Sequence, residues 1–427
     1  MSGCYVETLY HKTNLMSIFP KNFLWGASTS SHQVEGNTHN DWSEWEVTNA
    51  VRLAHEAEKK LDRLSSQSLI REQATNPENY ISGIACDHYH RFREDFDIAK
   101  QLGHNAHRFS IEWSRIEPEE GKFDDKEIEH YRDVIRALRE RGIEPFVTLW
   151  HWTVPVWFQQ KGGWLHSQSV RHFSRFVEKI SSDLGNDVRF WCTLNEPIVF
   201  TSYGYIIGVR PPQQKNILHA VLVFHRLARA HRKAYRILHG VAEKNKTTCS
   251  VGIAKHDKFF VSGDRSLKNR LLARLAKFFW NDAFMLHIRG YQDFVGLNYY
   301  NQDTIQFDRQ APYAGLYNLV SSPEGFYRTI MNMTRYKRPI YILENGIDDP
   351  TDAERPTFIH EHINALQRAM QDGADVRGYF HWSLMDNFEW ENGFWPRFGL
   401  VEVNRKTLER TIRSSAWEYK KIIKESL

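Results

Sequence analysis

Short apolar runs alternate along the 427-residue chain with longer stretches in which apolar residues recur at helical spacing. Eight of the short runs have the length and composition of buried strands: 23–27, 106–111, 145–150, 188–193, 250–254, 294–299, 339–343 and 377–382. Eight of the longer stretches are predicted helices: 88–102, 126–141, 169–184, 217–239, 266–289, 323–335, 355–372 and 414–425. Several of these helices end at a glycine, which suits a helix C-cap.

The regular alternation of predicted strands and helices indicates the fold class. Short strands separated by helices pair in parallel, and eight such units predict a closed (β/α)8 TIM barrel of the α/β class. We expect this barrel to form a single domain over residues 19–427, preceded by an N-terminal extension, residues 1–18. An open, doubly wound sheet is the alternative, but no glycine-rich phosphate loop follows the first predicted strand.

A hydrophilic stretch, residues 52–79, lies between the first predicted strand and its barrel helix. We interpret it as an inserted helix and loop. In a (β/α)8 barrel, an insertion at this point lies on the catalytic face. It serves there either as a lid or as a solvated surface element.

Composition narrows the class of protein. The net charge of +4 comes from 56 basic and 52 acidic residues, which argues against a dedicated nucleic-acid binder. The first 18 residues lack a continuous apolar stretch, and no run of 18 apolar residues occurs, so we expect neither a signal peptide nor a membrane span. The four cysteines form no CxxC pair, which favours free thiols in the cytoplasm.

Two glutamates follow predicted strands, and each is followed by a residue that turns the chain. Glu196 lies in Thr-Leu-Asn-Glu-Pro (193–197), and Glu344 lies in Leu-Glu-Asn-Gly (343–346). Both carboxylates are therefore expected at the mouth of the barrel. Cleavage of a glycosidic bond needs such a pair, one as proton donor and the other as nucleophile or base. The 14 Trp of the chain add rings that can stack on a sugar face.

Seven motifs together resemble glycoside hydrolase family 1, the retaining β-glucosidases and β-galactosidases of the (β/α)8 class. They occur in order from about residue 19 to the C-terminus: Phe-Leu-Trp-Gly (23–26), Gln-Val-Glu-Gly (33–36), Arg-Phe-Ser-Ile-Glu-Trp-Ser-Arg (108–115), Thr-Leu-Asn-Glu-Pro (193–197), Gly-Leu-Asn-Tyr-Tyr (296–300), Leu-Glu-Asn-Gly (343–346), and Trp-Ser-Leu with Asp-Asn-Phe-Glu-Trp (382–390). Any one motif is weak, whereas seven in order make chance negligible.

The resemblance implies a role for each catalytic residue. Glu196 matches the acid/base and Glu344 the nucleophile, while Arg108 and Tyr300 match residues that hydrogen-bond the nucleophile. Asn298, in the same motif as Tyr300, is placed with this catalytic group. A retaining enzyme holds its two carboxyls about 5–5.5 Å apart, so the charge of the nucleophile keeps the acid protonated until the sugar esterifies the nucleophile.

The resemblance also implies which residues bind the sugar. These are Gln33, His151 and Trp390 for the 3- and 4-hydroxyls, Glu389 for the 4- and 6-hydroxyls, Asn195 for the 2-hydroxyl, Trp382 beneath the sugar ring, and Trp152 beside His151. Enzymes of the 6-phospho-glycosidase branch replace the acid found here at Glu389, so an unphosphorylated sugar is expected. Relatives that cleave thioglucosides lack the acid/base Glu; its presence at Glu196 favours O-glycosides.

The chain departs from the family in length. The two catalytic glutamates are separated by 148 residues (344 minus 196), fewer than the family usually shows, and the shortened segment lies near Gly290, before the sixth predicted strand. The stretch 301–323 also looks abbreviated. Three consequences remain open: a more open leaving-group side, a less stable wall, or an exposed apolar patch that a second copy of the chain covers. The residues of that patch are Phe278, Phe279, Trp280 and Phe284.

We therefore expect a cytoplasmic retaining β-glycosidase that removes β-linked glucose, with galactose and fucose as further candidates, from small glycosides or disaccharides. The alternatives are a sugar-binding barrel with little or no catalysis and an enzyme that mainly transfers glycosyl groups. No metal or other cofactor is expected, because His360-Glu361-His362 lacks the spacing of a metal site. No nucleic acid or membrane partner is expected, and a homo-oligomer is left open.

Overall fold

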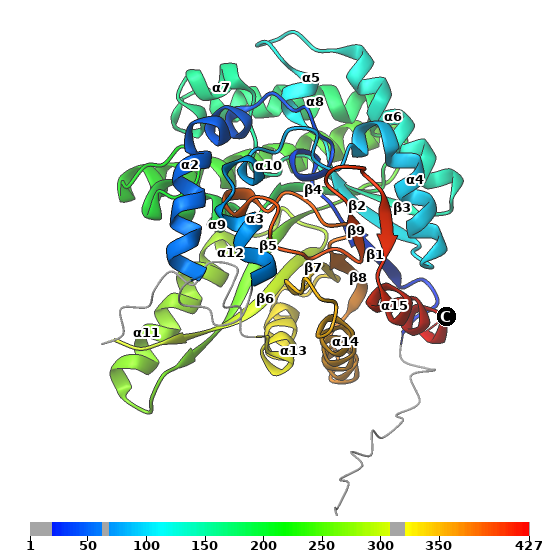
Figure 1. Cartoon of the computed structure of the whole chain (residues 1–427). Coiled ribbons are helices and arrows are strands. Elements are labelled where there is room, and N and C mark those ends of the chain that lie inside the picture. Colours follow the sequence, from blue (N-terminus) through cyan, green and yellow to red (C-terminus); the bar gives the residue numbers. More distant parts are fainter. Residues whose placement is uncertain (1–18, 62–67, 308–320, 427) are drawn as a thin grey trace, which may run out of the picture.

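Eight parallel strands close into a barrel, in chain order, with β8 paired to β1 (Figure 1). The computed structural model describes residues 19–61, 68–307 and 321–426, so the predicted extension 1–18 lies outside the described residues. The strands are β1 (Leu24–Ser28), β2 (Ala106–Ser110), β3 (Glu144–Thr148), β4 (Phe190–Asn195), β5 (Ser250–Ser262), β6 (Val295–Ile305), β7 (Ile340–Asn345) and β8 (Val376–Trp382). The predicted (β/α)8 barrel is confirmed.

Aromatic and small side chains fill the interior of the barrel. The Phe146 ring stacks on Phe190 with 4.9 Å between centroids and meets Phe294 edge-on at 5.2 Å. These rings belong to a buried cluster contributed by most of the strands: Ala106, Phe146, Phe190, Cys192, Ala254, Phe294, Tyr341, Leu343 and Phe380. The barrel is therefore a packed core below the catalytic face rather than a pore.

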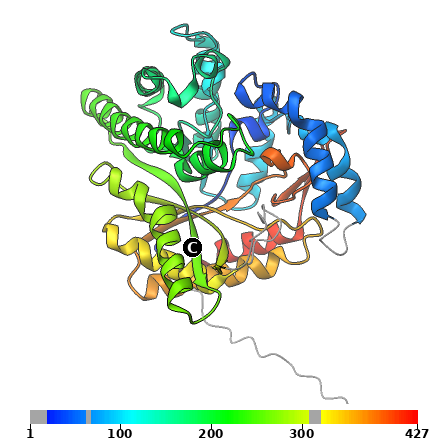
Figure 2. The same ribbon diagram turned by 90° about the vertical axis from the view of Figure 1, so that its left-hand side faces the viewer.

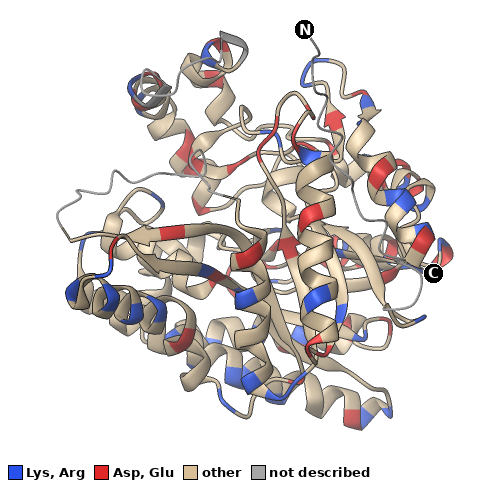
Figure 3. Ribbon diagram, turned by 90° about the horizontal axis from the view of Figure 1, so that it is seen from below, with Lys and Arg blue, Asp and Glu red and all other residues tan. Residues whose placement is uncertain are grey.

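Helices surround the strands on the outside of the barrel (Figures 1 and 2). In α8 (Ser169–Leu184), the buried residues Phe173, Val177, Ile180 and Leu184 follow the three- and four-residue spacing that places side chains on one helix face. The other barrel helices are α4 (His88–Gln101), α6 (Asp125–Glu140), α10 (Ile217–Asn245), α13 (Pro323–Met333), α14 (Arg355–Gln371) and α15 (Ser414–Ser426). Basic and acidic residues are interspersed over this outer layer in the view of Figure 3.

The predicted helix over 266–289 is present from Leu267 to His287, but a π-helical turn interrupts its regular α-helical hydrogen bonding. The stretch folds as α11 (Leu267–Lys277), a π-helical turn η4 (Phe278–Asp282) and α12 (Ala283–His287). The Asn281 amide, within the turn, accepts from the Lys258 N–H at 3.2 Å and donates to the Lys258 carbonyl at 2.9 Å. The turn is thus bound to β5, which together with β6 runs on beyond the barrel beside α11 (Figure 1).

The predicted exposed apolar patch is only partly present. Phe278 is 42% exposed and Phe279 is 62% exposed, as expected. Phe284, however, is buried in the core and Trp280 is half-buried, so the prediction is wrong for these two side chains. The Trp280 indole donates a hydrogen bond to His256 on β5, and the Phe284 ring packs edge-on against Phe224 of α10 at 5.2 Å between centroids.

The predicted insertion after the first strand contains two helices, α2 (Asp41–Leu61) and α3 (Ser68–Thr75), followed by η1 (Pro77–Tyr80). The first of these helices begins earlier than residue 52. Its Trp42 ring lies 4.6 Å from the Trp390 ring, in the loop after β8. The insertion therefore supports that loop at one end. Among the described residues, no helix is both long and apolar enough to cross a bilayer.

Candidate active site

The residues predicted to carry the chemistry lie together where the barrel strands end. Arg108 is on β2, Asn195 ends β4, Asn298 and Tyr300 are on β6, and Glu344 is on β7. Across the β6–β7 pair, Asn298 is in register with Glu344. All five side chains are buried. Hydrogen bonds and charges therefore act here in a medium of low dielectric constant, where they are stronger than in water.

Two donors hold the carboxylate of Glu344. One oxygen accepts a hydrogen bond from the Arg108 guanidinium, and the other accepts from the Tyr300 hydroxyl at 2.7 Å. Burial raises the pKa of Glu344 above its ordinary value, while Arg108 and Tyr300 oppose that rise by binding the charged form. Burial and the Glu344 charge raise the pKa of Tyr300 well above 10, so the phenol stays protonated and donates. Glu344 is thus held as an oriented anion.

Glu196 has a different environment. Its backbone is left-handed, with φ 43° and ψ 59°, and its N–H donates to the Ala254 carbonyl at 2.8 Å. Such a conformation costs a non-glycine residue about 1–3 kcal/mol and persists only where the surroundings enforce it. Its carboxyl accepts a bond from the Asn298 amide at 2.8 Å. Burial, then the negative charge of Glu344, raises the pKa of Glu196 to about 8. At neutral pH this glutamate therefore carries a proton.

Asn195 connects the nucleophile side of the site to His151. The Asn195 Oδ1 accepts from the Arg108 guanidinium at 2.7 Å and from the Asn298 amide at 3.2 Å, so its Nδ2 is the donor. That Nδ2 lies 3.0 Å from the His151 Nε2, which must accept, and the imidazole proton is on Nδ1. Nδ1 is buried and has no partner among the described residues. It is therefore a buried donor that the described residues leave unsatisfied.

Three further predicted residues, Trp382, Glu389 and Gln33, lie at the end of β8, in the loop that follows it and in the segment after β1. Trp382 ends β8, and its indole N–H donates to Glu389 at 3.1 Å. Burial raises the pKa of Glu389 well above its ordinary value. The Gln33 amide donates to the Phe388 carbonyl at 2.7 Å and to the Asn387 Oδ1 at 2.9 Å, so the loop is tied to the segment that follows β1.

Aromatic rings form one wall of the site. The Trp390 ring lies 4.8 Å from Trp152 and stacks on the His151 imidazole with 5.8 Å between centroids. The Trp152 indole N–H donates to the Asn195 carbonyl at 3.1 Å. All twelve residues predicted for the site therefore converge on one mouth of the barrel, from the loops and ends of β1, β2, β3, β4, β6, β7 and β8.

Comparison with known proteins shows the family of the chain. The sequence profile of glycosyl hydrolase family 1 matches residues 15–289 and 258–426. The chain belongs to glycosyl hydrolase family 1. It is 32% identical over 466 residues to a 1,4-beta-D-glucan glucohydrolase of Thermotoga neapolitana, covering 96% of this chain and 99% of the relative. It is 31% identical to beta-glucosidase A of Thermotoga maritima, covering 96% and 98%.

Solved structures of glycosidases have the same fold as this chain. A beta-glycosidase from Pyrococcus horikoshii superimposes with a TM-score of 0.82 and 35% identity, covering 96% of each chain. The beta-glucosidase from Thermotoga maritima, solved in complex with glucoimidazole, has a TM-score of 0.80 and 30% identity, covering 96% of this chain and 99% of that one. The two profile matches overlap at residues 258–289, close to Gly290, where the sequence predicts a shortened segment.

Sequence reasoning missed a buried ion pair beside the wall of this family 1 site. The Arg210 guanidinium donates to the Glu391 carboxylate at 2.7 and 3.1 Å. It also lies 4.6 Å above the rings of both Trp152 and Tyr203. Glu391 lies in the short helix η7 (Trp390–Asn392) and Arg210 lies just after η3 (Ser202–Ile207), far apart in sequence, and no spacing or motif signals that they meet. The pair fixes the loop after β8 against the loop after β4.

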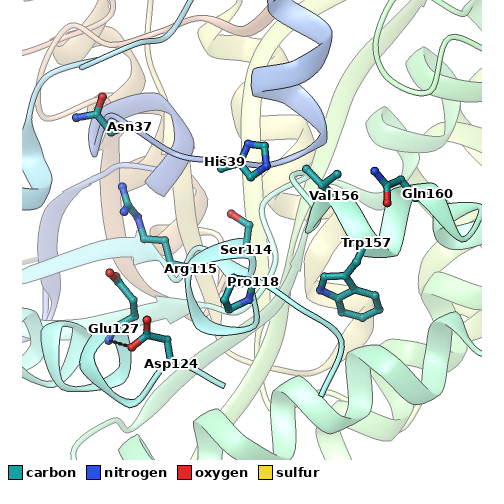
Figure 4. A pocket seen from close by; sticks show the side chains of 10 residues that line it. All are labelled: Asn37, His39, Ser114, Arg115, Pro118, Asp124, Glu127, Val156, Trp157 and Gln160. Atoms are coloured by element: carbon teal, nitrogen blue, oxygen red, sulfur yellow. Dashed lines mark hydrogen bonds between the residues drawn. The ribbon is translucent and has the colours of Figure 1, made fainter. Parts of the chain in front are cut away.

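A cavity of about 420 Å³ lies apart from these residues. Its lining comes from the loops after β1, β2 and β3, as Figure 4 shows: Asn37, His39, Ser114, Arg115, Pro118, Asp124, Glu127, Val156, Trp157 and Gln160. None of the residues predicted for the site lines it. Within the described part of the chain, no group of three or more His, Cys, Asp or Glu side chains is arranged to hold a metal ion.

Proposed function

We propose that this family 1 enzyme hydrolyses the terminal β-linked sugar of unphosphorylated O-glycosides by double displacement, with Glu344 as nucleophile and Glu196 as acid/base. The observation that carries the assignment is the contrast between the two buried carboxyls. Glu344 is bound by a guanidinium and a phenol. Glu196 is bound only by an amide and has a pKa raised to about 8. One carboxyl is suited to attack and the other to give a proton.

In the first step, an oxygen of Glu344 attacks the anomeric carbon and forms a glycosyl ester. The bond from that carbon to the leaving-group oxygen breaks, and this oxygen takes the proton of Glu196. The Arg108 guanidinium and the Tyr300 hydroxyl keep the attacking carboxylate oriented. Asn195, fixed by Arg108 and Asn298, would bind the 2-hydroxyl, a contact that strengthens as the oxocarbenium-like transition state forms.

In the second step, water attacks the anomeric carbon of the ester. Esterification has removed the negative charge of Glu344, so the pKa of Glu196 falls and its carboxylate can take the proton of that water. The bond between sugar and Glu344 breaks, which restores both carboxyls. The sugar leaves with the anomeric configuration it had in the substrate.

Recognition of the sugar falls to the residues of the β1, β3 and β8 loops. The His151 Nδ1–H is buried and has no partner in the described part of the chain, and it would donate to a ring hydroxyl. Trp382 would lie beneath the ring, and Glu389, positioned by the Trp382 N–H, would bind the 4- and 6-hydroxyls. A carboxyl at this place would repel a 6-phosphate. Glucose is the sugar we propose first, as in the names of the relatives, with galactose and fucose as further candidates.

Turnover of an aryl β-glucoside by the wild type and by Glu344→Ala tests the proposal. The variant should be inactive and should regain part of its turnover when formate is added, because formate can take the place of the missing carboxylate. Glu344→Gln is a matched control, since its amide fills the space that formate would need. A wild type that binds glucose without turning over any glycoside would instead support the sugar-binding alternative. Alkyl glucoside formed in place of glucose when an alcohol is added would support the transglycosidase.

The same proposal places the enzyme in the cytoplasm. Cys86 and Cys192 are buried, Cys249 is half-buried, and none of these three cysteines forms a disulfide. Free thiols at these positions favour a reducing compartment. Localisation of the tagged full-length protein by cell fractionation tests this, and recovery in the secreted fraction would contradict it.

A further inference from the structure

The segment after β1 carries a buried histidine that the proposed mechanism does not use. His32 lies in the short helix α1 (Ser31–Val34). Its Nε2 is 2.7 Å from a carboxylate oxygen of Glu46, on α2. Its Nδ1 is 2.8 Å from the Thr38 hydroxyl and 3.1 Å from the Asn40 amide nitrogen. A carboxylate only accepts, so Nε2 donates to Glu46. Both ring nitrogens have partners, and the plane of the imidazole is fixed.

The carboxylate that holds this imidazole is itself held. The second oxygen of Glu46 accepts from the N–H and from the hydroxyl of Ser82, each at 2.8 Å. Ser82 follows η1, so both residues belong to the insertion after β1. The side chains of His32 and Glu46 are 0% and 1% exposed. Water therefore does not compete for these hydrogen bonds, and the insertion determines how the imidazole lies.

The face of the imidazole lies against Trp390, one of the residues proposed to bind the sugar. The two rings are stacked, with 5.6 Å between centroids and 12° between planes. The Phe388 ring meets the imidazole edge-on at 5.8 Å. Stacked and edge-on rings attract each other through their faces and edges. His32 therefore supports the loop after β8 directly beneath the indole.

The placement of Trp390 depends on such support. Its backbone is left-handed, with φ 55°, a conformation that a residue other than glycine keeps only where its surroundings enforce it. Its indole N–H makes no hydrogen bond with any residue that the structure describes. The orientation of the indole is therefore set by the rings that pack on it: His32, Trp42, His151 and Trp152. Its N–H remains available to a ligand.

We propose that His32 is a positioning residue for sugar binding: its imidazole, fixed by Glu46, keeps the indole N–H of Trp390 directed at a hydroxyl of the terminal sugar. The inference rests on the proposed function and deepens it, because it identifies what holds a sugar-binding side chain that has no hydrogen bond of its own within the described residues. It also gives the insertion after β1 a role in sugar recognition, through Glu46 and Ser82.

The test compares 4-nitrophenyl β-glucoside with its 2-deoxy, 3-deoxy and 4-deoxy analogues. Every variant carries Glu46→Gln, so that loss of the imidazole leaves no buried charge unpaired. Relative to Glu46→Gln alone, His32→Ala should lower kcat/KM for the glucoside about tenfold, the effect of one lost hydrogen bond. The 2-deoxy analogue should show the same loss, because Asn195 is the residue proposed to bind that hydroxyl.

The other two analogues identify the contact. Trp390 is expected to bind the 3- or the 4-hydroxyl, and the analogue that lacks this hydroxyl cannot make the bond in any variant. For that analogue, His32→Ala should change kcat/KM less than about twofold. A general distortion of the site would instead lower all four values by the same factor, so the comparison separates positioning of Trp390 from a structural effect.

Two further variants complete the test. His32→Phe restores a ring that can stack on the indole and should recover about threefold of the lost activity. His32→Leu fills the space without such a ring and takes the place of His32→Ala if that variant does not fold. His88→Ala is the matched control, since His88 is a buried histidine bonded to a carboxylate at the same 2.7 Å, on α4. It should change none of the four values. Thermal unfolding shows which variants retain the fold.

Different results overturn different conclusions. A wild type that does not hydrolyse the glucoside would overturn both the proposed function and this inference. An active wild type in which loss of the imidazole lowers all four values equally, or lowers none of them, would overturn only the inference. The inference would also fail if His32→Phe recovered no activity, because stacking on the indole would then not be what the imidazole supplies.

Discussion

Replacing Glu344 by glutamine should lower the pKa of Glu196 by about two units. The substitution keeps the shape of the side chain and removes its negative charge. In the wild type, burial and this charge together raise the pKa of Glu196 from 4.5 to about 8. The variant removes only the second contribution, since the side chain remains as buried as before.

The size of the effect follows from the separation of the two carboxyls. At about 5.5 Å, the spacing of a retaining pair, and an effective dielectric constant of about 20, two unit charges repel by about 3 kcal/mol. One pKa unit corresponds to about 1.4 kcal/mol, so the charge of Glu344 accounts for about two units. The pKa of Glu196 should fall to about 6 in the variant, because burial still holds it above 4.5.

Carbon-13 NMR of protein labelled at the glutamate carboxyl carbon measures this directly. The resonance that disappears in Glu196→Gln identifies the group, and its shift is followed from pH 4 to pH 9. The pH dependence of the wild-type rate gives an independent measurement of the pKa of Glu196. Since Glu196 must be protonated to act as acid, kcat/KM should be lost as the pH rises through about 8.

An unchanged midpoint in Glu344→Gln would refute the reasoning. It would mean that burial alone raises the pKa of Glu196. The proton would then not be released when the sugar esterifies Glu344, and the second step would need another base. A wild-type rate that stays constant up to pH 9 would contradict the assignment of Glu196 as the acid.

Three further predictions concern the groups that support the site and the fold. Arg108→Met should lower kcat/KM at least a hundredfold, because the buried Glu344 carboxylate loses its cation, an effect of about 3 kcal/mol. Steady-state kinetics measure this, and a loss below tenfold would refute the prediction. Asp95 is buried between a histidine at 2.7 Å and an arginine at 2.8 Å, and these partners outweigh burial and lower its pKa. Its contribution is fully present above the unfolded pKa of about 4 and is lost progressively as the pH falls toward the lowered folded value, so Asp95→Asn should cost about 3 kcal/mol in urea unfolding at pH 7 and less at pH 3. Equal costs at both pH values would contradict this. Gly346→Ala would place a Cβ 1.9 Å from the carbonyl oxygen of Trp382, at the end of β8. We expect a lower unfolding temperature and, because Glu344 is displaced, at least a tenfold loss of kcat/KM. An unchanged unfolding temperature would show that the backbone relieves the contact without cost.

Most of the fold could be predicted because the barrel strands are apolar on both faces and are bounded by turns. The exception is β5, which continues to Ser262 although the predicted strand ends at residue 254. Lys255, His256, Asp257 and Lys258 look like the start of a loop in the sequence. In the structure Lys255 pairs with Asp257, and Lys258 pairs with an acid on β6, so the charges are neutralised and the strand continues.

The residues of the site likewise divide into those that the sequence reveals and those that only the folded structure brings together. Residues at strand ends, such as Glu196 and Glu344, occur in short motifs that a sequence displays directly. Pairs such as Arg210 with Glu391, or His256 with Trp280, are separated by many residues and form only when distant loops meet. The π-helical turn that contains Trp280 differs from an ordinary helix by a single residue per turn, which apolar spacing alone does not reveal.

The stacked rings of Phe146, Phe190 and Phe294 have a consequence for how product and substrate exchange. They close the barrel beneath Glu344, so the bound sugar has no exit through the floor. The same opening must admit the substrate, release the leaving group, admit water and finally release the freed sugar, in that order. A sugar released at this mouth must leave by the route through which the next substrate enters, so we expect the free sugar to compete with substrate for the same space.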